Sequence, residues 1–243
     1  MKRGQVTLYV IIAILIVVAA GILIYVQRAA VLSQFGYIPS YIRPIKTYSD
    51  ECLKSTLENG IYLVGMQGGF VETPAMSFET NFSIIAYSYL TGRNLFPNIT
   101  KVESQLSDYI NTMLPQCVDF SKWPDFTVSA NQVKSNVMIL ENEVLADANW
   151  PLTIEKGSTY QLNKFSTRLP VRLGLIHGIA STIVDKAMKD PTHIDLSYII
   201  DTNENYNLSI DLVPYNNTLV YSISDPQSIV FSRPYVFFIA KRS

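Results

Sequence analysis

Side chains that commonly perform catalysis are scarce in this sequence, since only two histidines occur, His177 and His193. His177 lies in an apolar stretch over 173–184 with helical spacing, where a lone histidine is more often structural than a general base. His193 lies between Asp190 and Asp195, a group that could orient the imidazole or supply two metal ligands, although metal sites need three or four. We therefore interpret this segment as a turn with an aspartate cap and expect no metal or cofactor.

The only two cysteines, Cys52 and Cys117, are predicted to form a disulfide. Both follow a long apolar segment that would export them to an oxidising compartment, where an even number of cysteines favours pairing. Two cysteines 65 positions apart without clustered histidines make a poor metal site. The chain-entropy model gives such a cross-link about 4 kcal/mol of stability. The alternative is two free buried thiols that pack as small apolar side chains.

Four asparagines head Asn-x-Ser/Thr sequons and are candidate glycosylation sites: Asn81, Asn98, Asn207 and Asn216. All four follow the apolar segment, so they are expected on the exported side of the membrane, where N-glycans are found. The 15 tyrosines could face a partner or glycans, although strand propensity and core packing account for most of them.

Neither glycine-rich segment has the signature of a phosphate-binding loop. Residues 65–69 lack the Lys-Ser/Thr ending, and residues 156–159 lack the leading glycine spacing. We interpret the first as the end of a helix and the second as a hairpin turn. The near balance of 19 basic and 20 acidic residues argues against a nucleic-acid partner, because binding phosphates requires a basic surface.

One apolar segment, Leu8 to Val26, predicts a transmembrane helix. It holds no charged residue and, at about 1.5 Å per residue, spans roughly 28 Å, close to the thickness of a bilayer core. Lys2 and Arg3 precede it and only Arg28 follows closely, so the positive-inside rule keeps the N-terminus in the cytoplasm and exports the rest. A cleaved secretory signal is the alternative, but its apolar region is usually about 7 to 15 residues long. We therefore expect a single-pass protein of the cell membrane with an extracellular C-terminal domain.

The patterns divide the chain into four regions. Residues 1–27 are expected to form the cytoplasmic tip and transmembrane anchor, and residues 28–46, which contain a glycine and two prolines, a stalk or linker. Residues 47–124 are expected to form a helical, disulfide-linked region, and residues 125–243 a sheet-rich exported region. The expected fold class is α+β, with one N-terminal transmembrane helix, a helical region and an antiparallel sheet-rich region.

Two helices are predicted in the region with the cysteines. The first covers 48–66, and the second starts with a capping box of Thr100 and Glu103. Cys52 lies near the start of the first helix and Cys117 just past the end of the second. Antiparallel packing of the two helices would therefore bring the sulfur atoms together.

The remaining apolar runs predict one more helix and several strands. The helix runs from Arg172 to Lys189 and is ended by Pro191. Residues 82–90 fit a buried strand or a short helix equally well. Strands are predicted at 126–130, 136–140, 143–148, 152–155, 208–212, 218–224 and 235–241.

The first residues, Lys2-Arg3-Gly4-Gln5, ahead of the apolar helix resemble the class III signal sequence of archaeal type IV pilin-like proteins. The resemblance implies cleavage between Gly4 and Gln5 by a prepilin peptidase, which would leave the helix on the mature protein. Polymerising members of that family usually carry glutamate at the fifth mature position, where this chain has Tyr9. A buried acid costs about 2.5 to 3.5 kcal/mol and is kept for a function, so its absence predicts weak self-assembly. An uncleaved signal anchor with a basic flank explains the same residues equally well.

The rest of the chain resembles a group of archaeal membrane-anchored surface proteins that share this start. The matching segments are Cys52 to Gly69 and Tyr109 to Phe120, with a weaker match at Asn149 to Ile154. The resemblance implies placement at the cell surface and implies no chemistry.

These observations predict a non-enzymatic, single-span cell-surface protein with an interaction or structural role in the envelope, either as a solitary anchor or as a minor pilin-like subunit. The expected partners are the lipid bilayer and other envelope proteins or pilin-like subunits. The alternative is a membrane-anchored exported enzyme, hydrolase-like, whose chemistry no motif reveals. A pocket that joins His177 or His193 to two carboxylates would favour the enzyme.

Overall fold

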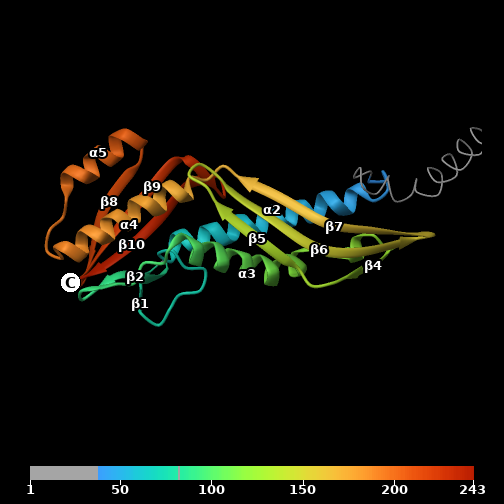
Figure 1. Cartoon of the computed structure of the whole chain (residues 1–243), viewed down its shortest axis with the longest axis horizontal. Coiled ribbons are helices and arrows are strands. Elements are labelled where there is room, and N and C mark those ends of the chain that lie inside the picture. Colours follow the sequence, from blue (N-terminus) through green and yellow to red (C-terminus); the bar gives the residue numbers. More distant parts are fainter. Residues whose placement is uncertain (1–37, 82) are drawn as a thin grey trace, which may run out of the picture. The chain divides into compact units, whose positions relative to one another are not determined.

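The computed structural model describes residues 38–81 and 83–243 (Figure 1). The predicted transmembrane segment and the predicted processing site at Gly4 and Gln5 lie outside these residues. The chain divides into two compact units, Met1–Pro44 and Ile45–Ser243. Of the first unit the structure describes a turn and the start of one helix, and the second unit holds the sheets and the other helices.

Helices and strands are mixed along the second unit, which confirms the predicted α+β class. The helices are α2 (Arg43–Met66), α3 (Ile99–Cys117), α4 (Leu173–Lys189) and α5 (Leu196–Tyr206), with a short 3-10 helix at Phe120–Lys122. The strands are β1 (Ser77–Glu79), β2 (Ile84–Leu90), β3 (Arg93–Asn94), β4 (Thr127–Ala130), β5 (Lys134–Ile139), β6 (Val144–Lys156), β7 (Ser158–Leu169), β8 (Ser209–Tyr215), β9 (Thr218–Val230) and β10 (Arg233–Arg242).

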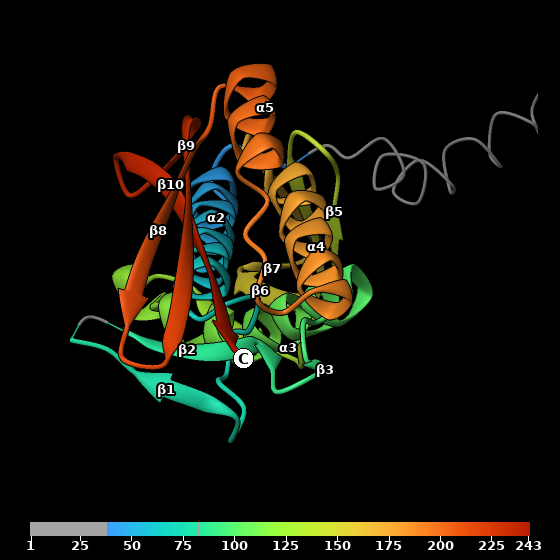
Figure 2. The ribbon, with the colours of Figure 1, turned by 90° about the vertical axis from the view of Figure 1, so that its left-hand side faces the viewer.

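The strands form two sheets. The first has the order β1-β2-β10-β9-β8, with β3 paired to β2, and the second places β7 on one side of β6 and β4 and β5 on the other. Neighbouring strands are antiparallel except for β2 and β10, which are parallel. Helix α4 contacts β2, β3 and β10, and α5 contacts β8 (Figure 2).

Helix α2 ends at the glycines, as predicted, but it begins at Arg43, five residues before the predicted start, so residues 43–46 of the predicted linker are helical. Its most buried side chains recur at helical spacing: Leu53, Leu57, Ile61 and Val64. After Met66, Gly68 and Gly69 have φ angles of +72° and +96°, which glycine adopts without steric cost. The N–H of Gly69 donates to the carbonyl of Val64 at 2.8 Å, and this bond closes the helix.

Helix α3 begins earlier than predicted, so the proposed capping box of Thr100 and Glu103 is wrong. The N-cap is Asn98, whose Oδ1 accepts a hydrogen bond from the N–H of Lys101 at 2.9 Å. Asparagine is among the best N-cap residues and lies two positions before Thr100. Glu103 instead accepts a hydrogen bond from the N–H of Ile139 in β5 at 2.9 Å.

Side chains of α3 replace a neighbouring strand along one edge of β5. Two residues of a strand extend about 6.8 Å, which is close to the roughly 5.4 Å rise of one helical turn. Every second N–H group of β5 can therefore donate a hydrogen bond to a side chain on successive turns of α3. The pairs are Ser135 N to Asn111 Oδ1 (2.7 Å), Val137 N to Ser107 Oγ (3.0 Å) and Ile139 N to Glu103 Oε1 (2.9 Å). These bonds remove donors that would otherwise be free to pair with another chain.

Several predicted strand boundaries need correction. The segments 143–148 and 152–155 belong to one strand, β6, whose pairing with β7 shifts register between Asn149 and Leu152. Trp150 is buried at this irregularity, and its Nε1–H donates to the carbonyl of Asn131 at 2.9 Å. The ambiguous segment 82–90 is a strand from Ile84 onward. Strands β1, β3 and β7 and helix α5 were not predicted.

Candidate functional site

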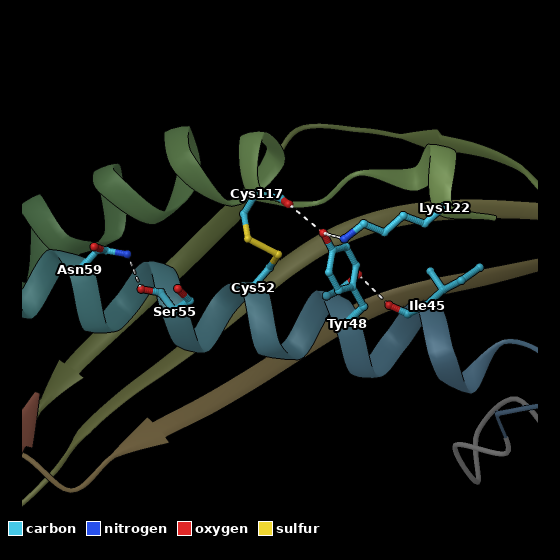
Figure 3. The surroundings of a disulfide bond; sticks show 8 residues. Ile45, Tyr48, Cys52, Ser55, Asn59, Cys117 and Lys122 are labelled. Atoms are coloured by element: carbon cyan, nitrogen blue, oxygen red, sulfur yellow. Dashed lines mark hydrogen bonds between the residues drawn. A yellow bond between two sulfur atoms is a disulfide. The ribbon is translucent and has the colours of Figure 1, made fainter. Parts of the chain in front are cut away.

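Cys52 and Cys117 form the predicted disulfide (Figure 3). Their Cα atoms are 5.7 Å apart, and Cys117 is the last residue of α3 rather than the residue after it. The two helices run antiparallel, because Gly60, two turns after Cys52, lies against Leu106, three turns before Cys117. A Cβ atom at Gly60 would lie 2.8 Å from Leu106 Cδ2, so glycine permits this close approach.

An aromatic residue beside the disulfide links α2 to the segment after α3 (Figure 3). The hydroxyl of Tyr48 donates to the carbonyl of Cys117 at 3.3 Å and accepts a hydrogen bond from Lys122 Nζ at 2.8 Å. The same ammonium lies 4.2 Å from the centre of the Tyr48 ring, and the ring of Trp123 packs edge-on at 5.4 Å. The hydrogen bond to Tyr48 raises the pKa of Lys122. These contacts hold the start of α2 against the end of α3, next to the disulfide.

His177 is a buried structural side chain in α4. Its Nε2 lies 2.8 Å from the carbonyl oxygen of Pro97, and its ring packs at 4.8 Å on the ring of Phe96. Burial lowers the pKa of His177, and only an Nε2–H tautomer can donate to the carbonyl. The neutral imidazole therefore ties α4 to the segment that precedes α3.

His193 lies in a turn built by two aspartates, as predicted. Asp190 accepts hydrogen bonds from the N–H groups of Thr192 and His193, at 3.0 and 3.2 Å. Asp195 caps α5 by accepting from the N–H of Tyr198 at 2.9 Å, and it pairs with Lys186 at 2.8 Å. The hollow lined by His193 and Asp195 has a volume of about 10 Å³, close to the space that one water molecule needs. Within residues 38–81 and 83–243, no three His, Cys, Asp or Glu side chains converge to hold a metal ion.

All four sequon asparagines are exposed, and all lie outside the regular strands and helices. Asn98 uses its Oδ1 to cap α3, which leaves its Nδ2, the atom that carries an N-glycan, out of this bond. Asn207 and Asn216 both have φ angles of +52°, at the end of α5 and in the β8–β9 turn. Asn81 lies between β1 and β2. Their positions are compatible with glycosylation at each site.

A groove of about 470 Å³ lies between the C-terminal half of α2 and the β9–β10 hairpin, and we name it the turn groove. Its mostly apolar lining includes Tyr62, Met66, Phe231, Pro234, Val236 and Phe238, with Arg233 also at the groove. This volume lies within the range of small-molecule and peptide side-chain sites. Phe231, which lines the groove, and the neighbouring Ile229 expose 43% and 53% of their surface, so both side chains are accessible to a partner.

The turn itself has a strained backbone. Phe231 and Ser232 join β9 to β10 with φ angles of +50° and +60°. Two-residue hairpins of this kind favour Asn-Gly, because a bulky side chain at positive φ costs about 1 to 2 kcal/mol. The N–H of Phe231 donates to Glu58 Oε1 at 2.8 Å, and its ring packs edge-on against Tyr62 at 5.6 Å. Helix α2 therefore holds Phe231 in a conformation that its own backbone disfavours.

Helix α2 packs closely against β10 beside the turn groove. A Cβ atom at Gly65 would lie 2.2 Å from the carbonyl oxygen of Val236, so only glycine fits between the helix and the strand. Next to it, the buried hydroxyl of Tyr235 donates to the carbonyl of Ile61 at 3.3 Å. Burial raises the pKa of Tyr235, so this hydroxyl stays protonated as a donor.

A buried ion pair fixes β9 just before the turn. Pairing with β10 skips three residues between Asp225 and Ile229, and the carboxylate of Asp225 holds this bulge by accepting from Ser228 Oγ and from the N–H of Gln227. Arg172 at the start of α4 pairs with the same carboxylate, with Nε at 2.9 Å. Burial alone would raise the pKa of Asp225, but the hydrogen bonds from Arg172 and Ser228 lower it overall.

Comparisons with protein-family models, with curated protein sequences and with solved structures find no match to this chain. Among the helices of residues 38–81 and 83–243, none has the length and apolar character needed to cross a bilayer. The function of the chain must therefore be inferred from its own residues and their arrangement.

None of the residues of the turn groove was among the sites predicted from the sequence. The available signal was the dipeptide Phe231-Ser232 between two strand-like runs, at a place where a two-residue turn needs positive φ angles. A turn without glycine or asparagine marks either a longer loop or a strained hairpin. The sequence alone does not distinguish these two possibilities.

Proposed function

We propose that this chain is a non-enzymatic, single-span cell-surface protein whose exported α+β domain binds another envelope protein through the turn groove. The apolar segment Leu8 to Val26 and the basic residues before it support the anchor and its orientation. The Cys52–Cys117 disulfide supports an oxidising compartment outside the cytoplasm.

The strained and exposed Phe231 carries the proposal. Residues held in unfavourable backbone conformations persist only where the surroundings fix them, and they concentrate at binding and catalytic sites. Here the contacts with α2 hold a large aromatic side chain, on a strained backbone, against an apolar groove. Aromatic side chains of this kind are typical anchors of protein interfaces.

The chemistry of the groove describes the partner. Its apolar lining fits aliphatic or aromatic side chains, and the exposed Arg233 at the groove makes no ion pair or side-chain hydrogen bond with a described residue. A partner segment with two or more apolar residues and a nearby carboxylate would match both features. We therefore expect a short segment of a neighbouring envelope protein rather than a large flat surface.

The test replaces the turn by one that suits its backbone. Phe231→Asn together with Ser232→Gly removes the aromatic side chain while relieving the strain, so stability should be kept or raised by about 1 kcal/mol. A photo-cross-linking residue in place of Ile229 should capture a partner in intact cells, and the double substitution should abolish that cross-link. Arg233→Glu should weaken it at least fivefold.

The matched control is Ile200→Asn on α5, where an equally exposed apolar side chain (55%) lies away from the groove. This control should leave the cross-link unchanged. A partner captured equally well by the chain with the Asn-Gly turn would refute the assignment of the turn groove.

The pilin-like processing is proposed as a separate property of the N-terminus. If the peptidase acts, the mature protein begins at Gln5, and Gly4→Val blocks cleavage. N-terminal mass spectrometry of the membrane-bound protein distinguishes this from a chain that begins at Met1 or Lys2.

A further inference from the structure

A second hollow lies along the outer face of α3, on residues that the proposed function does not use. This α3 groove has a volume of about 530 Å³ and runs between α3 and the loop that follows α2. Phe70, Pro74 and Glu72 come from the loop, and Lys101, Asp108 and Tyr109 from the helix. The volume fits a ligand of two or three sugar rings or a short peptide.

The loop wall of the α3 groove is held in place before any ligand binds. The N–H of Val71 donates to Gln105 Oε1 at 3.3 Å, which ties the loop to the middle of α3. Just before it, Gly69 packs so tightly on Pro97 that a Cβ atom would lie 2.8 Å from the proline ring. A preformed wall lowers the ordering cost of binding.

The lining combines aromatic rings with polar groups that are free to bind. Phe70 and Tyr109 are each half-buried, whereas Glu72, Lys101 and Asp108 are exposed. The three charged side chains make no side-chain hydrogen bond or ion pair with any residue that the structure describes. Carboxylates and an ammonium beside aromatic rings can bind hydroxyl groups in several directions while a ring packs against C–H groups.

The polar surface continues past the end of the α3 groove. Thr112 lines both this groove and a second hollow of about 580 Å³, whose other side chains include Asn131 and Gln132. Both amides are exposed, and each offers a donor and an acceptor. Because the two hollows share Thr112, the polar side chains of the second adjoin the mixed aromatic and polar lining of the α3 groove.

We propose that the α3 groove binds a neutral oligosaccharide. A sugar ring presents an apolar C–H face and a rim of hydroxyl groups, which corresponds to the mixture of aromatic rings and planar polar side chains found here. The mixed charge of Glu72, Asp108 and Lys101 favours a neutral ligand over a polyanion. The two adjoining hollows favour a chain of several sugars over a single one. This binding is independent of the turn groove.

The experiment uses the full chain, purified in a detergent without a sugar head group, with maltotriose, mannotriose and triacetylchitotriose as probes. Calorimetric titration to about 10 mM should detect at least one of them, since a dissociation constant near 1 mM corresponds to about −4 kcal/mol. Asp108→Ala and Lys101→Ala should each weaken that binding about tenfold. Neither side chain has a folding role in the described residues, so both variants should keep the melting temperature of the parent chain.

The matched control is Gln116→Ala, an exposed α3 position outside both hollows. It should bind the same trisaccharide as the parent chain does. Failure of all three probes to bind, or binding that Asp108→Ala and Lys101→Ala leave unchanged, would overturn the proposal. Tighter binding of an unglycosylated peptide at the same residues would replace the sugar by a protein ligand.

Discussion

Replacing either cysteine by alanine should lower the free energy of unfolding by about 4 kcal/mol. The Cys52–Cys117 bond closes a loop of 65 residues. For that length the chain-entropy relation gives about 14.5 cal/mol/K, or about 4 kcal/mol at 25 °C. This is a large fraction of the 5 to 15 kcal/mol that stabilises a typical domain. The loss should therefore be visible in any equilibrium unfolding measurement.

The assay is urea unfolding of the purified full chain, followed by the fluorescence of its two tryptophans. With an m value of about 2 to 3 kcal/mol/M, the midpoint should fall by about 1.5 to 2 M. Cys52→Ala, Cys117→Ala and the double variant should have the same midpoint within about 0.5 M, because each removes one shared cross-link. A reductant should lower the midpoint of the parent chain by the same amount and leave the variants unchanged.

Additive losses would refute this reasoning. If the double variant lost twice as much stability as either single variant, the two side chains would contribute through separate packing. Alkylation of both thiols in the folded parent chain would exclude the bond itself.

Two further substitutions test the packing and the buried histidine. Gly65→Ala should lower the free energy of unfolding by about 2 to 3 kcal/mol, because the new Cβ atom would lie 2.2 Å from the carbonyl oxygen of Val236. Gly178→Ala should instead stabilise α4 by about 0.5 to 1 kcal/mol, because no atom lies within 4 Å of the new Cβ atom. Equal effects of both substitutions would contradict the close approach of α2 and β10. Burial lowers the pKa of His177 in the folded state, so below pH about 6.5 the unfolded chain binds a proton that the folded chain does not. The free energy of unfolding should therefore decrease as the pH is lowered below that value. His177→Gln should remove this contribution to the pH dependence of stability.

The sequence pattern was sufficient for elements with a strong apolar stripe. Helix α4 was predicted within one residue, because apolar residues from Leu173 to Ala187 recur at helical spacing and Pro191 follows. The disulfide was predictable because the same pattern placed one cysteine near the start of α2 and the other near the end of α3. Both inferences use periodicity and end signals, which are local properties of the chain.

Elements whose burial is sparse were not predictable. In β7 the buried side chains are Leu162, Phe165 and Leu169, at spacings of three and four residues, so the strand lacks the alternation that identifies a half-buried strand. Helix α5 buries only Ile199 and Thr202. Both elements are positioned by their neighbours, β6 and β8, rather than by their own periodicity.

The turn groove was missed for a different reason. Its two walls come from α2 and the β9–β10 hairpin, which are more than 150 positions apart in the sequence, and its key residue, Phe231, contradicts local preference. A pattern-based prediction favours agreement between local propensity and structure, and that agreement is weakest at strained sites. The energetic support for Phe231 comes from Glu58 and Tyr62, whose role appears only in three dimensions.

Two sheet edges of this protein are protected from pairing with another chain, and this bears on the proposal that the turn groove binds a partner. Side chains of α3 accept hydrogen bonds from the N–H groups along one edge of β5. At the edge strand β8, Asn203 Oδ1 accepts a hydrogen bond from the N–H of Ile210, and Pro214 has no N–H group. Such features prevent unwanted strand pairing between chains. Beside these two protected edges, Ile229 and Phe231 stay exposed, and Phe231 does so where it lines the apolar turn groove. Since an Asn-Gly turn would connect β9 to β10 with less strain, the proposed contact with a partner would account for Phe231 at this position.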